Sequence, residues 1–198
     1  MNTFIELTGV NQELLIFLAI DVAIAIILLG AMRFLSGISA QVNSTEELAT
    51  NDNFAFGISV AGSILALGIV LTGAITGENA SSYMMEVIGM FAYGAYGLIL
   101  IKVGRVIHDK VALQRLDKMA LIREQNLTVG VVDAAGAIAT AIIIRAVLLW
   151  VDGLDLSTFI AITCGFFVAQ MMLVIVTRLR ENQYAKNNQN DCLQEAFA

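Results

Sequence analysis

The chain has 198 residues, of which 58% are hydrophobic and only 14% charged, and its mean hydropathy is +0.80. This composition excludes an ordinary soluble domain, and a net charge of −6 without a broad basic face argues against a nucleic-acid-binding protein. Apolar runs of about 20 residues, the length needed to cross a bilayer, recur along most of the chain. We therefore predict an all-α integral membrane protein that forms a single membrane domain over residues 1–198.

Five apolar runs predict five transmembrane helices, at residues 14–35, 54–76, 84–107, 126–150 and 157–177. A charged segment, residues 108–125, separates the third run from the fourth, and we expect it to be helical at the membrane interface. The chain ends in a polar, Asn- and Gln-rich tail, residues 182–198, which we expect to be mobile and cytoplasmic.

The basic residues are confined to one side of this arrangement. The segments at residues 1–13, 77–83 and 151–156 contain acids but no Lys or Arg, and Arg145 alone of the eleven basic residues falls on their side. The positive-inside rule then places the N-terminus outside and the C-terminus in the cytoplasm of a bacterial inner membrane. The cations that set this orientation follow the third and fifth spans: Lys102, Arg105, Lys110, Arg115, Lys118, Arg123, Arg178, Arg180 and Lys186.

The chain also contains an internal repeat. A shift of 73 residues places Asn53 on Asn126, Gly57 on Gly130 and Arg105 on Arg178. We interpret residues 53–108 and 126–181 as tandem two-helix repeats, preceded by one extra helix at residues 14–35. Each repeat crosses the membrane twice, so the copies have parallel orientation, with a pseudo-twofold axis along the membrane normal.

The fourth span contains ionisable residues that are costly in a bilayer. Each of Asp133 and Arg145 costs roughly 2.5–3.5 kcal/mol near the bilayer centre. At helical spacing they share one stripe with small and polar residues, so we expect this stripe to face other helices or a wet cavity. Its members are Asp133, Gly136, Ala137, Thr140, Ala141 and Arg145.

Depth along the helices predicts partners for these charges. On the outer side we pair Arg145 with Asp21, with Glu86 as a further member, and on the inner side we pair Lys102 with Asp133. Such pairs either fix helix register or mark a polar path or ligand pocket. Both interpretations stay open for Asp133.

Two further spans carry interior-facing polar residues. The third offers Tyr93 and Tyr96, and the fifth offers Thr163, Gln170 and Thr177 at intervals of seven. Interhelical hydrogen bonding is the simpler interpretation of both sets. The basic segment between the third and fourth spans either sets topology alone or also binds anionic lipid headgroups.

Motifs of known enzyme chemistry are missing from the sequence. His108 is the only histidine, and there is no P-loop, GxSxG or HExxH motif. We therefore expect no cofactor, no metal and no enzymatic activity.

The sequence resembles the bacterial YjfL-like inner-membrane family, domain of unknown function 350. The resemblance lies in Asn53-Phe54-Ala55-Phe56-Gly57 before a Gly/Ala-rich span, and in Asn126 to Gly130 before Asp133-Ala134-Ala135-Gly136. It extends over about residues 50–181 and implies tandem two-helix repeats in the inner membrane, without a catalytic motif to carry over. Gene neighbourhoods of such proteins imply a role in membrane maintenance or stress by association.

We predict a non-enzymatic, homo-oligomeric inner-membrane protein that serves membrane integrity or docks a cytoplasmic partner of the membrane-stress type. The alternative is a small transporter or ion channel with a polar path along the third to fifth spans. The residues at stake are Asp21, Glu86, Tyr93, Lys102, Asp133, Arg145 and Gln170.

Overall fold

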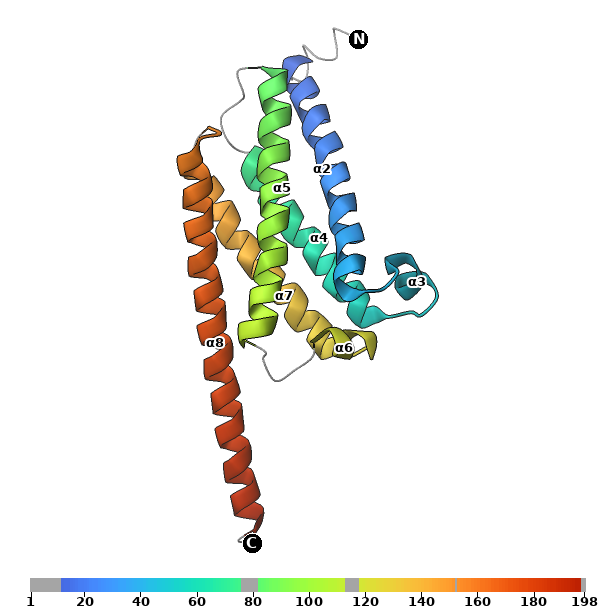
Figure 1. The fold of residues 1–198 in the computed structure, drawn as a ribbon, viewed down its shortest axis with the longest axis vertical. Helices are drawn as coiled ribbons and strands as arrows, with labels where there is room; N and C mark the ends of the chain where they lie inside the picture. The colour runs from blue at the N-terminus through green and yellow to red at the C-terminus, as the bar shows by residue number, and fades with distance from the viewer. Residues whose placement is uncertain (1–11, 76–81, 113–117, 152, 197–198) are drawn as a thin grey trace, which may run out of the picture.

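The computed structural model describes residues 12–75, 82–112, 118–151 and 153–196, and its regular elements are all helices (Figure 1). In chain order these are α2 (Gln12–Ala40), α3 (Ser44–Ala49), α4 (Phe54–Ile75), α5 (Tyr83–Ile107), the π-helical turn η1 (His108–Ala112), α6 (Lys118–Arg123), α7 (Leu127–Leu148) and α8 (Leu156–Ala196). Within the described ranges there is no strand. The predicted all-α class is confirmed.

Five of these helices, α2, α4, α5, α7 and α8, are long and apolar enough to cross a membrane. The five predicted spans are therefore confirmed, with ends that shift by a few residues. The predicted end of the second span at residue 76, and most of the turn after it, lie outside the described residues. Many large apolar side chains on the outer faces are exposed, as expected for surfaces that contact lipid.

The centre of the bundle is the parallel pair of α4 and α7, whose N-termini lie at the same end (Figure 1). Small residues let the two backbones approach closely. A Cβ on Gly62 would lie 2.3 Å from the Ala134 Cβ, and one on Gly130 would lie 2.5 Å from the Ala55 carbonyl oxygen. Glycine is therefore required at both positions for this pair to form.

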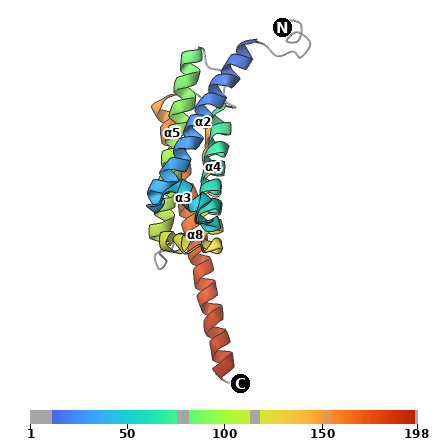
Figure 2. The ribbon, with the colours of Figure 1, turned by 90° about the vertical axis from the view of Figure 1, so that its right-hand side faces the viewer.

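The other long helices lie around this pair. α5 packs against α4, α2 and α7, and α8 packs mainly against α7 (Figures 1 and 2). The largest fully buried side chains include Met32 of α2, Leu67 of α4, Ile101 of α5, Ile144 of α7 and Phe166 of α8. One apolar core thus joins all five spans.

The repeat is visible at the starts of α4 and α7. The Asn53 side chain accepts a hydrogen bond from the Phe56 backbone N–H at 2.9 Å, and the Asn126 side chain accepts one from Val129 at 3.3 Å. The paired asparagines are therefore both helix N-caps. The paired arginines differ, because Arg105 is buried in the bundle while Arg178 donates to the Val111 carbonyl oxygen at 2.6 Å.

The C-terminal tail differs from expectation, and the charged segment before α7 is described only in part. The polar tail, expected to be mobile, instead continues α8 as one helix to Ala196, and Figures 1 and 2 show it extending well beyond the bundle. Within residues 108–125 the structure describes two short helical pieces, η1 and α6, and residues 113–117 between them lie outside the described residues. The second piece places a charged side chain inside the protein.

Candidate functional site: a buried ion network

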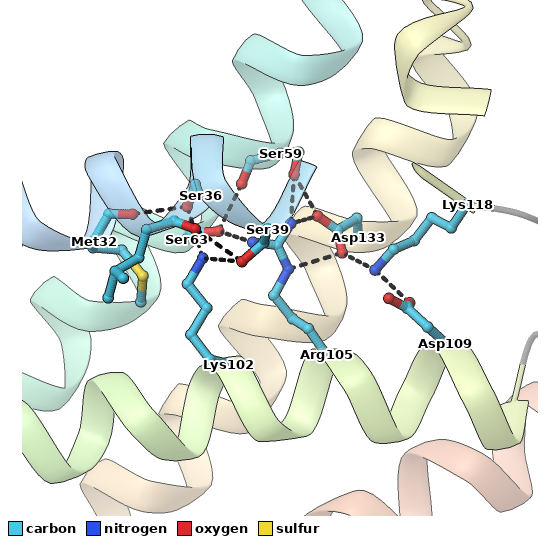
Figure 3. Close-up of polar contacts among 11 residues, drawn as sticks. Met32, Ser36, Ser39, Ser59, Ser63, Lys102, Arg105, Asp109, Lys118 and Asp133 are labelled. Carbon is cyan, nitrogen blue, oxygen red and sulfur yellow. Dashed lines mark hydrogen bonds and ion pairs between the residues drawn. The ribbon is translucent and has the colours of Figure 1, made fainter. Parts of the chain in front are cut away.

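Asp133 on α7 is the centre of a polar network at the end of the bundle where α5 ends and α7 begins, which we call the basic end (Figure 3). Asp133 is only 3% exposed. Its carboxylate accepts hydrogen bonds from Ser59 of α4 at 2.5 Å, from the Arg105 Nε of α5 at 3.0 Å, and from the Lys118 Nζ of α6 at 2.5 Å. Four elements therefore meet at one carboxylate.

The Arg105 guanidinium extends this network to a second hydroxyl of α4. It forms an ion pair with Asp133, and its two terminal nitrogens donate to Ser59 at 2.5 Å and to Ser63 at 2.7 Å. The Ser63 hydroxyl in turn donates to the Ser59 backbone carbonyl. A planar guanidinium fork suits this geometry, because it binds the carboxylate of α7 and the serines of α4 at once.

Lys118 balances the charge of the network. Its Nζ contacts both Asp133 and Asp109 of η1, so two cations face two carboxylates (Figure 3). Burial lowers the pKa of Lys118 to about 8, and the charge of Asp109 opposes part of that effect. Pairing of this kind is what makes buried charges tolerable in a low-dielectric interior.

The predicted pair of Lys102 with Asp133 is wrong. The Lys102 Nζ donates to Ser36 of α2 at 3.0 Å and lies 3.5 Å from the Ser39 hydroxyl, while Asp133 is bound by Arg105 and Lys118. Arg105 lies one helical turn further along α5, and depth alone could not separate the two cations. Lys102 therefore ties α5 to α2.

The predicted outer pair of Arg145 with Asp21 also does not form within the described residues. The Arg145 Nε instead donates to Thr72 of α4 at 3.0 Å, which is the equivalent position of the other repeat. Asp21 of α2 is buried near Glu86, and its Oδ1 has no hydrogen-bond partner among the described residues. Of the predicted outer network, Asp21 and Glu86 lie together, but Arg145 contacts neither of them.

The expected interior polar residues of spans three and five lie along one seam between α5, α7 and α8. Tyr93 donates to the Gly153 carbonyl oxygen, and the Tyr96 hydroxyl lies 2.5 Å from that of Thr163. Further along, Gln170 donates to Thr140 at 2.9 Å. The seam ends at His108, whose ring nitrogen lies 3.3 Å from the Thr177 hydroxyl. These helices are therefore hydrogen-bonded to one another along their length.

A small cavity lies where this seam meets the ion network. Its volume is about 10 Å³, close to the space of a single water molecule, and Arg105, Asp133, Thr140 and Gln170 are among its walls. The Gln170 side-chain oxygen is buried without a protein partner. A water molecule in this cavity would satisfy it.

Sequence reasoning found Asp133 but missed the rest of its network, namely Ser59, Ser63, Arg105 and Lys118. A signal for three of them existed: Ser59 and Ser63 are four residues apart and share a helix face, and Arg105 continues the glycine-marked face of Gly94, Gly97 and Gly104. The stripe prediction for the fourth span is confirmed for Asp133, Ala137, Thr140 and Ala141, which are buried, whereas its other members Gly136 and Arg145 are only half-buried. No local signal in the charged segment marks Lys118 as buried.

Among the described residues, no group of three or more His, Cys, Asp or Glu side chains is placed so that it could hold a metal ion. The network consists of fixed ion pairs and hydroxyls, with no thiolate and no carboxylate cluster. Its geometry suits the joining of helices.

Comparison with known proteins gives one match. The family model described as Domain of Unknown Function (DUF350) matches residues 8–148, which run through the first four spans and exclude α8. This corrects the extent of the resemblance, which we expected to begin near residue 50 and to include the fifth span. No curated protein and no solved structure matches the chain. The chain is a multi-span membrane protein that belongs to the DUF350 family.

Proposed function

We propose that the protein is a non-enzymatic scaffold of the bacterial inner membrane, which serves membrane integrity and docks a cytoplasmic partner through the protruding end of α8. The observation that carries this proposal is the occupancy of Asp133. This acid is bound by Ser59, Arg105 and Lys118, and the adjacent cavity has a volume of only about 10 Å³. A bundle with its central charges paired and little internal water suits a rigid anchor better than a conduit.

The orientation we propose places the N-terminus outside and the basic end in the cytoplasm. Its support is the segregation of Lys and Arg along the chain, read with the positive-inside rule. In this orientation the end of α8 projects from the cytoplasmic side. The segment beyond the bundle is about 16 residues of polar helix, or roughly 24 Å, which is long enough to pair with a partner helix.

The alternative function is transport or conduction along the seam between α5, α7 and α8. The specific observation in its favour is the row of hydrogen-bonded polar groups from Tyr93 to His108, together with the unsatisfied oxygen of Gln170. A transport path would require this row to open into a continuous aqueous passage.

Flux into proteoliposomes separates the two functions. Purified full-length protein and its Asp133→Asn variant would be reconstituted, and uptake of protons, alkali cations and polyamines measured between pH 5 and 8. The scaffold proposal expects both proteins to match empty liposomes. Uptake by the wild type that the variant loses would overturn it and establish the seam as a path.

The docking role has its own test. Affinity purification of the full chain from native membranes would be compared with that of a chain ending at Arg180, with both placed in the same membrane fraction. The proposal expects a soluble protein that is recovered only with the full chain. Identical sets of recovered proteins would remove α8 as the docking element while leaving the flux result untouched.

A further inference from the structure

A second cavity lies between α2 and α3, away from the ion network. Its volume is about 350 Å³, within the range of small-molecule sites. One wall is a single face of α2, formed by Gly30, Arg33, Phe34, Gly37 and Ile38. The other wall is the turn from α2 into α3, residues 42–45, which brings the polar side chains of Asn43, Ser44 and Thr45 to the cavity.

The two glycines of α2 have different roles in building this cavity. A Cβ on Gly37 would lie 2.2 Å from the Ser44 hydroxyl, so glycine is needed there for the chain to fold back against α2. A Cβ on Gly30 would meet no atom within 4 Å, so that position borders open space. The turn at Gly37 therefore creates the cavity, whereas a larger side chain at position 30 would fill the cavity without disturbing the fold.

Arg33 makes the cavity positively charged. Its side chain is exposed, and among the described residues its guanidinium has no hydrogen bond and no ion pair. None of the residues lining the cavity is acidic. Two cations of the neighbouring basic segment are used within the protein, since Lys118 binds Asp133 and Arg123 donates to the Ala40 carbonyl oxygen at 2.8 Å. Arg33 remains available to an external anion.

The position of the cavity identifies which anion can reach it. α2 is a candidate span of 29 residues, about 44 Å long, so its last turns reach the headgroup layer of the basic end. Phe34 and Ile38 border the cavity and are 69% and 56% exposed, which places apolar surface beside the cation. A ligand that matches both is an amphiphile, with a phosphate for Arg33 and an acyl chain for Phe34 and Ile38.

We propose that the cavity between α2 and α3 binds the headgroup of an anionic phospholipid in the leaflet at the basic end. The guanidinium of Arg33 binds the phosphate through paired N–H donors, and the side chains of Asn43, Ser44 and Thr45 bind the polar remainder of the headgroup. This site is independent of the function proposed above, because it shares no residue with the ion network or with the end of α8.

Lipid titration of the delipidated full-length protein in detergent tests the site. Binding of phosphatidylglycerol would be measured by native mass spectrometry for the wild type and for three variants. Arg33→Gln removes the cation, Gly30→Leu fills the cavity, and Arg180→Gln removes an equal charge from an exposed position on α8. We expect at least a tenfold loss of affinity in the first two variants and no change in the third.

Competition experiments on the wild-type protein show whether the site binds a lipid or a soluble anion. We expect phosphatidylcholine to bind at least fivefold more weakly than phosphatidylglycerol, and millimolar inorganic phosphate not to displace the lipid. Displacement by inorganic phosphate would overturn the lipid assignment in favour of a soluble phosphate. Equal losses in Arg33→Gln and Arg180→Gln would overturn the site itself, because binding would then follow overall charge. The two wild-type arms decide between a lipid and a soluble anion even if a variant fails to fold, and Gly30→Leu tests the location independently of Arg33→Gln.

Discussion

The two ends of the α4/α7 pair hold charge in different ways. At the basic end, Asp133 is 3% exposed and is bound by Ser59, Arg105 and Lys118 from three other elements. Towards the opposite end, Arg145 of the same helix is half-buried and donates to Thr72. Both charged side chains lie on α7 and contact α4, and they differ in how far burial removes water from the charged group. A fully desolvated charge needs several partners, whereas a half-buried one needs few.

Asp133→Ala should have the largest effect on stability. Removing the carboxylate leaves Arg105 and Lys118 buried with Asp109 as their remaining acid, so we expect a loss of about 3–5 kcal/mol in the free energy of unfolding. Unfolding by denaturing detergent in fixed micelles, followed by circular dichroism, measures it. A loss below about 1 kcal/mol would show that the cations can reach water or headgroups.

The close contact of α4 and α7 gives the next largest effect. Gly130→Ala would place a methyl group 2.5 Å from the Ala55 carbonyl oxygen, and we expect a loss of about 1–3 kcal/mol from forced separation of the helices. Gly136→Ala on the same helix is the matched control, because its Cβ would meet nothing within 4 Å. There we expect no loss, or a gain of up to about 1 kcal/mol from helix propensity. Equal effects in the two variants would contradict the packing.

Raising the pH above about 8 should stabilise the folded protein through Lys118. Because its pKa is about 8 in the folded protein and 10.5 ordinarily, the unfolded chain binds more protons at this site between those values. The free energy of unfolding should therefore rise with pH in this window, by at most about 1.4 kcal/mol per unit. Lys118→Arg, which stays protonated, should lack this rise. Parallel pH profiles for the two proteins from pH 8 to 9.5 would refute the assignment.

We expect the smallest loss of stability from a substitution at Arg145, at the end of the α4/α7 pair opposite the basic end. Arg145→Ala removes a hydrogen bond to Thr72 in a half-buried setting, so we expect a loss of no more than about 1 kcal/mol. Thr72→Val should give a similar value, and the double variant should lose little more than either single one. If Arg145→Ala matched Asp133→Ala, burial would not explain the difference between the two ends.

The parts of this structure that follow from local sequence were predictable. Apolar length located the spans, and helical spacing placed Asp133, Ala137 and Thr140 on a buried face. Partner choice was not predictable in this way. Lys102 and Arg105 lie within one turn of each other, and which of them faces α7 depends on how α5 is rotated about its axis.

Lys118 marks a second limit of sequence reasoning. It lies in a charged segment that composition assigns to the interface, yet it is 3% exposed because α6 returns towards the start of α7. The position of α6 depends on tertiary contacts, which a local sequence pattern cannot predict. The α8 tail is a similar case, since its polar composition suggested a flexible end where the helix continues.

The continuity of α8 has a mechanical consequence. The helix runs from Leu156 to Ala196 without an interruption, and the chain contains no proline that could act as a joint. Twist or tension applied at its free end would therefore be transmitted along the shaft rather than absorbed at a hinge. It would arrive first at the Arg178–Val111 and His108–Thr177 hydrogen bonds, which hold α8 to η1, and only then at the Gln170–Thr140 hydrogen bond deeper in the bundle.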